Sequence, residues 1–262
     1  MNTDSPTTSP SVSGHVTIVF TSDWGVSTGV GLAGRTHSKI ERGSNGQPIV
    51  RGTVITGVLR EQAMLAARAL DGPDEKSPKK WTSFALWLFG QDPDSEPSST
   101  PHPRHVLFSD ATPASKIPVH DTVSLSIDPQ TGTARDQFLR FTERAAPGVL
   151  TGTFTLIDEA GSEFSDPATI KAAHFLLGVA GLMVRGIGSG HSGGDGECTV
   201  LVTNHEVEAR EGQSTSSFVT YASDQAKSLR TNLKNFAASL TAKAANKLPA
   251  PQQSGTQHQV GT

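Results

Sequence analysis

The segment Gly186–Glu197, GIGSGHSGGDGE, contains the pattern G-x-S-x-G centred on Ser192. In serine hydrolases this pattern presents the nucleophile on a turn that follows a strand and precedes a helix. Here an apolar segment typical of a buried helix precedes the pattern, and the β-branched segment CTVLVTN follows it. A triad would also have to use His205 or His258, the only later histidines. A serine hydrolase that uses Ser192 is therefore a remote alternative.

The glycines of the same loop permit a different chemistry, the binding of an anion by the backbone. Glycine has no side chain, so its N–H group can approach a phosphate closely. A helix-to-strand connection that needs several positive φ angles would explain the glycines as well, and both interpretations stay open. The residues for which the pattern predicts RNA contact are Gly188, Ser189, Ser192, Gly193 and Gly194.

The basic residues are concentrated in one part of the sequence. The chain carries a net charge of −3 over 262 residues, which by itself predicts no nucleic-acid partner. The distribution of charge is more informative, and residues 35–68 contain six basic side chains and two acidic ones. The side chains for which we predict phosphate contact, with simple solvation as the alternative, are Lys39, Arg42, Arg51 and Arg60.

Local patterns predict the elements that position these residues. Thr53 is the expected N-cap of the first helix and Gly72 its stop, and Asp166 followed by proline is expected to cap a buried helix that reaches Arg185. The expected strands cover residues 15–22, 104–111, 149–158 and 198–204, and the expected helices cover 53–71, 77–90 and 167–185. This order predicts an α+β fold with a ferredoxin-like βαββαβ core, in which a long basic loop, residues 23–51, is inserted.

Residues 119–147 are expected to form a protruding, hairpin-like arm. Val123, Leu125 and Ile127 alternate with polar residues, and the sequence DPQTG that follows them favours a turn. Aromatic rings interleaved with basic side chains are suited to base stacking and to neutralising a phosphate backbone. Phe141 is instead expected to anchor the base of the arm in the core. The arm residues for which we predict RNA contact are Arg135, Phe138, Arg140 and Arg144.

Composition limits the other classes of protein. Cys198 is the single cysteine, so an internal disulfide and a multi-cysteine metal site are both excluded. Residues 1–14 have neither a basic nor an apolar stretch and are expected to be a disordered leader rather than a signal peptide. We expect one domain over 15–204, a partly helical extension over 205–245 and a disordered tail over 246–262. No apolar run reaches the ~20 residues of a membrane span, so a soluble, cytoplasmic protein is expected.

Three segments together resemble the RAMP superfamily of CRISPR-associated proteins. The segment GQPIVRGTVITGVLRE resembles the glycine- and proline-containing box of that family, with Thr53 and Arg60 in register. The segment from Val123 to Phe154 resembles part of the backbone subunit of type III effector complexes, and the loop after Arg185 resembles the family's glycine-rich signature. The resemblance extends in order over roughly residues 15–204 and is more specific than any one motif.

The resemblance implies an RNA-recognition-type fold and a role in antiviral defence. Members of this family bind guide CRISPR RNA, face target RNA and assemble with other RAMP subunits and a large subunit. Their copies can stack into a filament, and each inserts a thumb hairpin between nucleotides. The resemblance therefore identifies the arm as the thumb and Thr53 as a further RNA-binding residue.

One departure from the family bears on catalysis. Catalytic relatives carry an aspartate in the loop before the box, and here that position falls on Thr36 or His37. The leading hypothesis is therefore a guide-binding backbone subunit with weak or no enzymatic activity and no cofactor. The alternative is a target-RNA endoribonuclease. It would use His37 as an acid or base, or Asp23 from a position out of register, and it would need magnesium only in that case.

Overall fold

The computed structural model describes residues 12–29, 38–73, 79–90, 103–157, 166–190, 193–204, 224 and 226–231, without the side chains of 135–138. The leader up to residue 11, His37, Ser192 and most of the chain beyond 204 lie outside the described residues. The elements are β1 (Ser13–Phe20), α1 (Gly52–Asp71), α2 (Lys80–Phe89), β2 (Val106–Phe108), β3 (Thr112–Pro113), β4 (Val119–Ile127), β5 (Ala134–Ala145), β6 (Gly148–Leu156), α3 (Pro167–Met183) and β7 (Cys198–Thr203).

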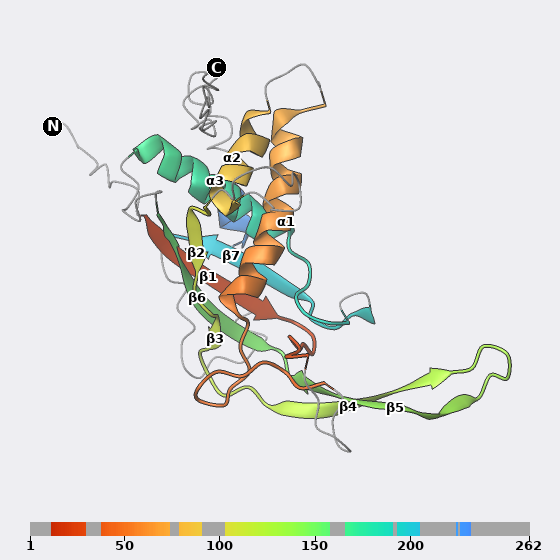
Figure 1. Cartoon of the computed structure of the whole chain (residues 1–262). Coiled ribbons are helices and arrows are strands. Elements are labelled where there is room, and N and C mark those ends of the chain that lie inside the picture. Colours follow the sequence, from red (N-terminus) through yellow and green to blue (C-terminus); the bar gives the residue numbers. More distant parts are fainter. Residues whose placement is uncertain are drawn as a thin grey trace, which may run out of the picture.

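The main sheet has the strand order β2-β6-β1-β7, with β3 also paired to β6. The central strand β1 is antiparallel to both neighbours, so that Ile18 lies opposite Leu150 on one side and Val200 on the other. These three side chains point to the same face of the sheet and are buried in one core cluster with the apolar faces of α1, α2 and α3. The three helices therefore cover one face of the sheet (Figure 1). The predicted mixed fold of helices and antiparallel strands is confirmed. β1 begins at Ser13, two residues before the predicted start.

The start of α1 differs from the prediction. Thr53 lies inside the helix, which begins at Gly52 and has no cap from the residue that precedes it. The N–H group of Gly52 instead donates to Oδ1 of Asp110, a residue of the β2–β3 connection, at 2.9 Å. A side chain at Gly52 would not fit there, because its Cβ would lie 2.2 Å from the carbonyl oxygen of Phe108. The end of the helix is as predicted, at Gly72 with φ of 74°.

The other two helices begin at aspartate caps. Asp166 accepts hydrogen bonds from the N–H groups of Ala168 and Thr169 at 3.1 and 3.2 Å, which confirms the cap predicted for α3. α2 begins at Lys80, later than predicted. Its first N–H groups donate to Asp71 of α1, so one aspartate ends α1 and caps its neighbour.

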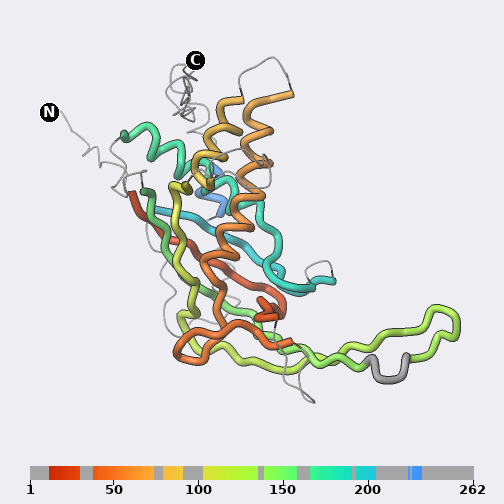
Figure 2. The backbone as a smooth tube through the Cα atoms, in the orientation of Figure 1, coloured from red at the N-terminus to blue at the C-terminus, as the bar shows by residue number. Residues whose placement is uncertain are grey.

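β4 and β5 form a separate two-stranded sheet. This hairpin projects well away from the body of the molecule (Figures 1 and 2). Its turn is closed by two backbone hydrogen bonds of 2.8 Å, from Gly132 to Asp128 and from Asp128 to Thr133. Gly132 has a φ of 68°, which a residue with a side chain adopts at a cost. The hairpin predicted for residues 119–147 is therefore present as β4 and β5.

Candidate nucleic-acid interface

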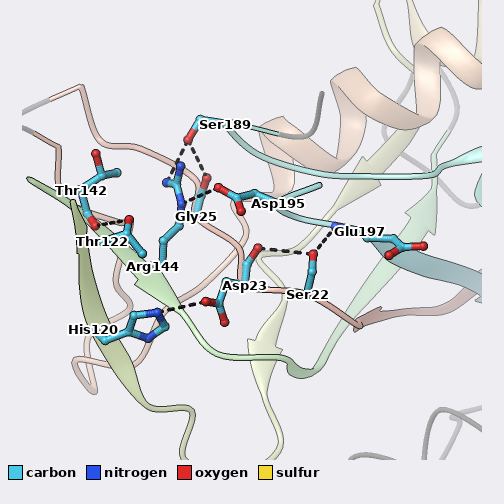
Figure 3. A network of polar contacts seen from close by, with 10 residues as sticks. All are labelled: Ser22, Asp23, Gly25, His120, Thr122, Thr142, Arg144, Ser189, Asp195 and Glu197. Carbon is cyan, nitrogen blue, oxygen red and sulfur yellow. Dashed lines mark hydrogen bonds and ion pairs between the residues drawn. The ribbon is translucent and has the colours of Figure 1, made fainter. Parts of the chain in front are cut away.

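Three segments that are distant in the sequence meet where β1 ends. They are the loop after β1 (residues 22–29), the base of the β4–β5 hairpin, and the glycine loop between α3 and β7 (residues 186–197). We call their meeting point the junction (Figure 3). Trp24 and Ala145 exchange two backbone hydrogen bonds of 2.9 and 2.8 Å, and the N–H group of Ser189 donates to the carbonyl of Gly25 at 3.0 Å. The loop after β1 is thus held between the hairpin and the glycine loop.

Arg144 is the principal side chain of the junction. Its Nε lies 3.0 Å from Asp195 Oδ2, and one of its terminal nitrogens donates to Ser189 Oγ at 3.2 Å. The arginine side chain is only 11% exposed, whereas that of Asp195 is 40% exposed. Arg144 therefore ties the hairpin to the glycine loop. The RNA contact predicted for it is not retained in our proposal, because its charge is already balanced by a carboxylate.

Asp23 and His120 form a second contact across the junction. His120 Nε2 lies 3.0 Å from Asp23 Oδ2, and the two side chains are 44% and 39% exposed. Because His120 lies opposite Arg144 in the β4–β5 register, it faces the loop after β1. No pattern in the sequence pointed to His120, since its partner lies 97 residues away. Asp23 was predicted as a possible catalytic residue, and its carboxylate is hydrogen-bonded to the imidazole of His120.

Most of the described amides of the glycine loop already have a hydrogen-bond partner, either within the loop or in the loop after β1. Among its described amides, those of Gly193 and Asp195 donate to the carbonyl of Gly190, and that of Gly196 donates to the backbone carbonyl of Asp23. Positive φ angles at Gly188, Gly190, Gly194 and Gly196 shape the turn. This geometry favours the structural connection over a cradle made by the whole loop. Gly193 and Gly194 are exposed, and an added Cβ at either would meet no atom within 4 Å, so this end of the loop has room for a ligand.

The order of elements also bears on Ser192. The glycine loop follows α3 and precedes β7. A nucleophile elbow follows a strand and precedes a helix, so this serine does not lie in the setting that a hydrolase needs. The serine itself and His37 lie outside the described residues.

Arg51 is engaged by two carboxylates. Its Nε donates to Glu41 at 2.9 Å and one terminal nitrogen donates to Asp110 at 2.8 Å. The hydrogen bonds to Glu41, and then to Asp110, raise the pKa of the arginine. The pKa of Asp110 is lowered, first by the N–H group of Gly52 and then by Arg51. With its charge compensated in this way, Arg51 is not retained in our proposal as a phosphate contact.

The remaining predicted basic residues differ in their surroundings. Arg42 donates to the carbonyl of Gly46 at 3.0 Å and lies 3.4 Å from the carboxylate of Glu143. None of the ion pairs between described residues includes Lys39, Arg60 or Arg140. Arg140 is exposed, the other two are half-buried, and Thr53 is exposed on the first turn of α1. Arg135 and Phe138 lie on β5, but their side chains are outside the description.

The hairpin has two chemically different faces. Because Val123 lies opposite Phe141 and Leu125 opposite Leu139, these four side chains share one face. The exposed fractions on it are large: 54% for Val123, 55% for Leu125, 59% for Ile127 and 44% for Leu139. Phe141 is half-buried nearer the base, but it is not among the side chains that pack against the core cluster, so its predicted role as an anchor in the core stays a prediction. The opposite face carries the polar side chains His120, Thr122, Ser124, Arg140, Thr142 and Arg144.

The described part of the chain also bears on metal binding, membrane insertion and thiol chemistry. No group of three or more histidine, cysteine, aspartate or glutamate side chains in that part of the chain could hold a metal ion. None of the helices there has the length and apolar character that a bilayer-spanning helix requires. Cys198 is buried, and burial raises the pKa of its thiol to about 12, so the thiol stays protonated and unreactive at neutral pH.

Comparison with solved structures shows the same fold in subunits of CRISPR complexes. A chain of the type III-B Cmr-beta complex bound to cognate target RNA matches with a TM-score of 0.54 and 8% identity, over 74% of this chain and 98% of that one. A chain of the same complex in the apo state has a TM-score of 0.55 and 9% identity, over 75% and 99%. A chain of a type IV-B CRISPR complex has a TM-score of 0.50 and 16% identity, over 78% and 95%.

Comparison with curated protein sequences gave no match. The sequence model of the RAMP superfamily, in contrast, matches residues 9–198, which include every strand and helix from β1 to α3 and the whole junction. The resemblance seen in the three sequence segments is confirmed by this match, and the chain belongs to the RAMP superfamily.

Proposed function

We propose that this chain is a guide-RNA-binding backbone subunit of a CRISPR effector complex of type III or a related type. Membership of the RAMP superfamily and the likeness to chains of type III-B and type IV-B complexes support the proposal. The order β2-β6-β1-β7, with α1 and α3 following β1 and β6, fits the ferredoxin-like, RNA-recognition-type plan. The proposed partners are guide and target RNA, other RAMP subunits, the large subunit and further copies of this chain.

The observation that carries the proposal is the polar face of the protruding hairpin. Arg140 lies there among the hydroxyl groups of Thr122, Ser124 and Thr142, and it is exposed. A cation and several hydroxyls on one strand pair can neutralise and hydrogen-bond phosphate oxygens without reading the base sequence. Sequence would then be read by base pairing between guide and target, which is how guide-dependent complexes gain their specificity.

The test is the affinity of the purified chain for single-stranded RNA of two unrelated sequences. Arg140→Glu is expected to weaken binding to both by about tenfold, the equivalent of one charge-assisted hydrogen bond of about 1.5 kcal/mol. Arg68→Glu is the matched control, because Arg68 is exposed at the far end of α1, remote from the hairpin (Figure 1). Equal losses in the two variants would contradict a specific role of the hairpin and show only a response to net charge.

A second candidate function, cleavage of target RNA, is favoured by the Asp23–His120 pair alone. A carboxylate that holds an imidazole can fix its tautomer, so that the other ring nitrogen takes a proton from a 2′-hydroxyl group. In that reaction the 2′-oxygen would attack phosphorus, the bond to the 5′-oxygen would break, and a proton would pass to the leaving oxygen. Among the described residues, no second histidine or carboxylate hydrogen-bonds to this pair, so we propose that cleavage is weak or absent.

Cleavage is measured on labelled RNA complementary to a bound guide, with and without magnesium. Asp23→Asn and His120→Asn test the pair, and Asp121→Asn is the control, because Asp121 lies on the other face of β4. Intact target RNA with all four proteins is the expected result. Cuts that disappear in both variants of the pair but persist in the control would make the pair catalytic. Cuts that disappear only in His37→Ala would place catalysis on the residue predicted from the sequence.

A further inference from the structure

We infer that the outer face of the main sheet, the face turned away from α1, α2 and α3, docks the chain's own C-terminal segment and is closed to RNA. The outer face consists of the odd-numbered positions of β1, β6 and β7, because the even-numbered ones point into the core. The inference rests on two independent features of this face, its composition and the burial of its centre.

The composition of the outer face does not suit base stacking. RNA-recognition sheets bind single strands by stacking bases on exposed aromatic rings. Here Phe20 and Phe154 both point to the inner, helix-covered face. Among the described strands the outer face carries no phenylalanine, tyrosine or tryptophan; its residues are Ser13, His15, Thr17, Val19, Leu107, Thr112, Val149, Thr151, Thr153, Thr155, Thr199, Leu201 and Thr203.

The centre of the outer face is nevertheless buried. Thr17 and Val19 are each 1% exposed and Leu201 is 0% exposed, although the buried faces of α1, α2 and α3 pack against the other side of the sheet and α3 adds Leu182 to the packing around Val19 and Leu201. By contrast Thr153, on the same face of β6, is exposed. A bare sheet would leave the central positions open to water, so another part of the chain must cover them.

The described element that packs on this centre is the helical segment 226–231. Ala226 is 4% exposed and forms one apolar cluster with Val19 and Leu201, against which Val149 and Leu182 also pack. Leu229, one turn further along, is half-buried. Ala226 and Leu229 lie on the same side of a helix because they are three residues apart. The segment therefore has one face turned to the sheet, and its exposed residues are Lys227, Ser228, Arg230 and Thr231.

The functional consequence is a restriction on the path of the RNA. With the centre of the outer face occupied, a guide strand has access to the hairpin, the loop after β1 and the open end of the glycine loop. One basic side chain, Arg140, lies on the hairpin, and another, Lys39, lies on the segment that pairs with the loop after β1, where its carbonyl accepts from the N–H group of Thr28. This part of the inference rests on the proposed function, whereas the docking of the segment does not.

Thiol labelling of the full-length chain tests the docking. The Thr17→Cys variant places a thiol at the covered centre, and the Thr153→Cys variant places one on the open part of the same face. We expect the first thiol to react at least about tenfold more slowly, because labelling requires local opening. Equal rates for the two thiols in the otherwise unchanged chain would overturn the inference.

A second substitution removes the cover. Ala226→Glu, added to the Thr17→Cys variant, should bring the labelling rate of the covered thiol close to that of the thiol in the Thr153→Cys variant. Ser228→Glu, on the exposed side of the same helix, should leave the rate at the covered thiol low. A covered thiol that stays equally slow with Ala226→Glu would show that another part of the chain covers the sheet.

Two controls make the result specific. Native Cys198 faces the core and is 6% exposed, so it reports unfolding, and it must stay unlabelled in Ala226→Glu. If Ala226→Glu unfolds the chain, Ala226→Ser replaces it, with a smaller expected increase in the labelling rate of the covered thiol.

Docking within one chain also predicts labelling rates that do not depend on protein concentration. A covered thiol that becomes reactive on dilution would show that the segment of a second copy occupies the face, and would overturn docking in the same chain.

A further arm of the experiment examines RNA. With RNA bound, as shown by co-purification, the thiol of the Thr153→Cys variant is expected to stay as reactive as without RNA. Protection of this thiol by RNA would overturn the exclusion of RNA from the outer face. A failure to bind RNA at all would contradict the proposed function and leave the docking result intact.

Discussion

At the scale of single residues, Asp110 shows how far apart in the sequence the two partners of a structural contact can lie. Its carboxylate accepts from the N–H group of Gly52 and from Arg51, at a sequence distance of 58 or 59 residues. Thr53 has the residue type of an N-cap and the expected position, yet it does not cap α1. A local pattern can predict that a helix starts, but not that a distant carboxylate provides the cap.

We predict that Asp110→Ala lowers the free energy of unfolding by about 1 kcal/mol, the usual effect of losing an N-cap. Arg51 keeps its contact with Glu41 in this variant, so the loss reports mainly the start of α1. Urea denaturation followed by circular dichroism measures it. Asp121→Ala, an exposed aspartate on the hairpin, is the control and should change the free energy little. Equal values for Asp110→Ala and the unaltered chain would show that the cap adds no stability.

The same carboxylate predicts a pH effect. The pKa of Asp110 is lowered below 3.8 in the folded chain, chiefly by the hydrogen bond from Gly52. A lowered pKa means that the stabilisation is present above the pKa of the unfolded chain and is lost as the pH falls through the folded pKa. Below pH 3.8, therefore, the stability difference between Asp110→Ala and the unaltered chain should shrink as the pH falls. A difference that widens on acidification would contradict this assignment.

At the scale of elements, the sequence predicted the helices and strands better than the tertiary contacts between them. The helix starts and stops carried by Asp166 and Gly72 are local, and so is the alternation that marks the hairpin. The junction depends on tertiary register instead: Arg144 contacts Asp195 across 51 residues, and Asp23 contacts His120 across 97. No periodicity in the sequence specifies these pairs. For that reason Arg144 was predicted on the correct strand but without its contact to the glycine loop.

The structure of the glycine loop predicts different effects on stability when Gly188 and Gly193 are replaced by alanine. Gly188 has a φ of 103°, and an added Cβ would lie 2.5 Å from the carbonyl oxygen of Gly25. Gly188→Ala should therefore lower the free energy of unfolding by about 1–3 kcal/mol, from backbone strain alone. At Gly193 an added Cβ meets nothing within 4 Å, so Gly193→Ala should fold with nearly unchanged stability. Thermal or urea unfolding compares the two, and equal losses would contradict this description of the loop.

The tolerance of Gly193 also gives a clean test of the remaining cradle hypothesis. Gly193→Val should leave the fold intact, so a loss of RNA binding in this variant would report a ligand at the open end of the loop. Unchanged binding would establish that the loop is a connection. The same comparison could not be made at Gly188, where a larger side chain disturbs the junction itself.

Arg144 is predicted to hold two elements together rather than to bind RNA. Arg144→Gln should speed hydrogen exchange at the amide of Ser189, which donates to Gly25, by roughly tenfold, because a charge-assisted hydrogen bond of about 1.5 kcal/mol is lost. Arg140→Gln, on the same strand but exposed, should leave this amide unchanged. If exchange at Ser189 were as slow in Arg144→Gln as in the control, the ion pair would not restrain the glycine loop.

At the scale of the whole molecule, the acidic net charge makes the location of free basic side chains decisive. With a net charge of −3, the chain cannot attract RNA by its overall field. Basic side chains already paired with carboxylates, such as Arg51 and Arg144, form part of the structure and are not available to release counterions from RNA. The segment 226–231, as inferred above, further narrows the accessible surface. Any RNA affinity must therefore depend on the few basic side chains outside these pairs.

The salt dependence of RNA binding tests this distinction. Arg60 lies on α1 and takes part in none of the ion pairs between described residues, whereas Arg51 contacts Glu41 and Asp110. If Arg60 contacts a phosphate, Arg60→Gln should reduce the slope of log K against log salt by about 0.7, the value for one phosphate of a single strand. Arg51→Gln should leave the slope unchanged, and its effect should be on the stability of α1. Binding to two RNA sequences across a salt series measures both. A reduced slope for Arg51→Gln would mean that RNA displaces its carboxylate partners, and an unchanged slope for Arg60→Gln would remove it from the interface.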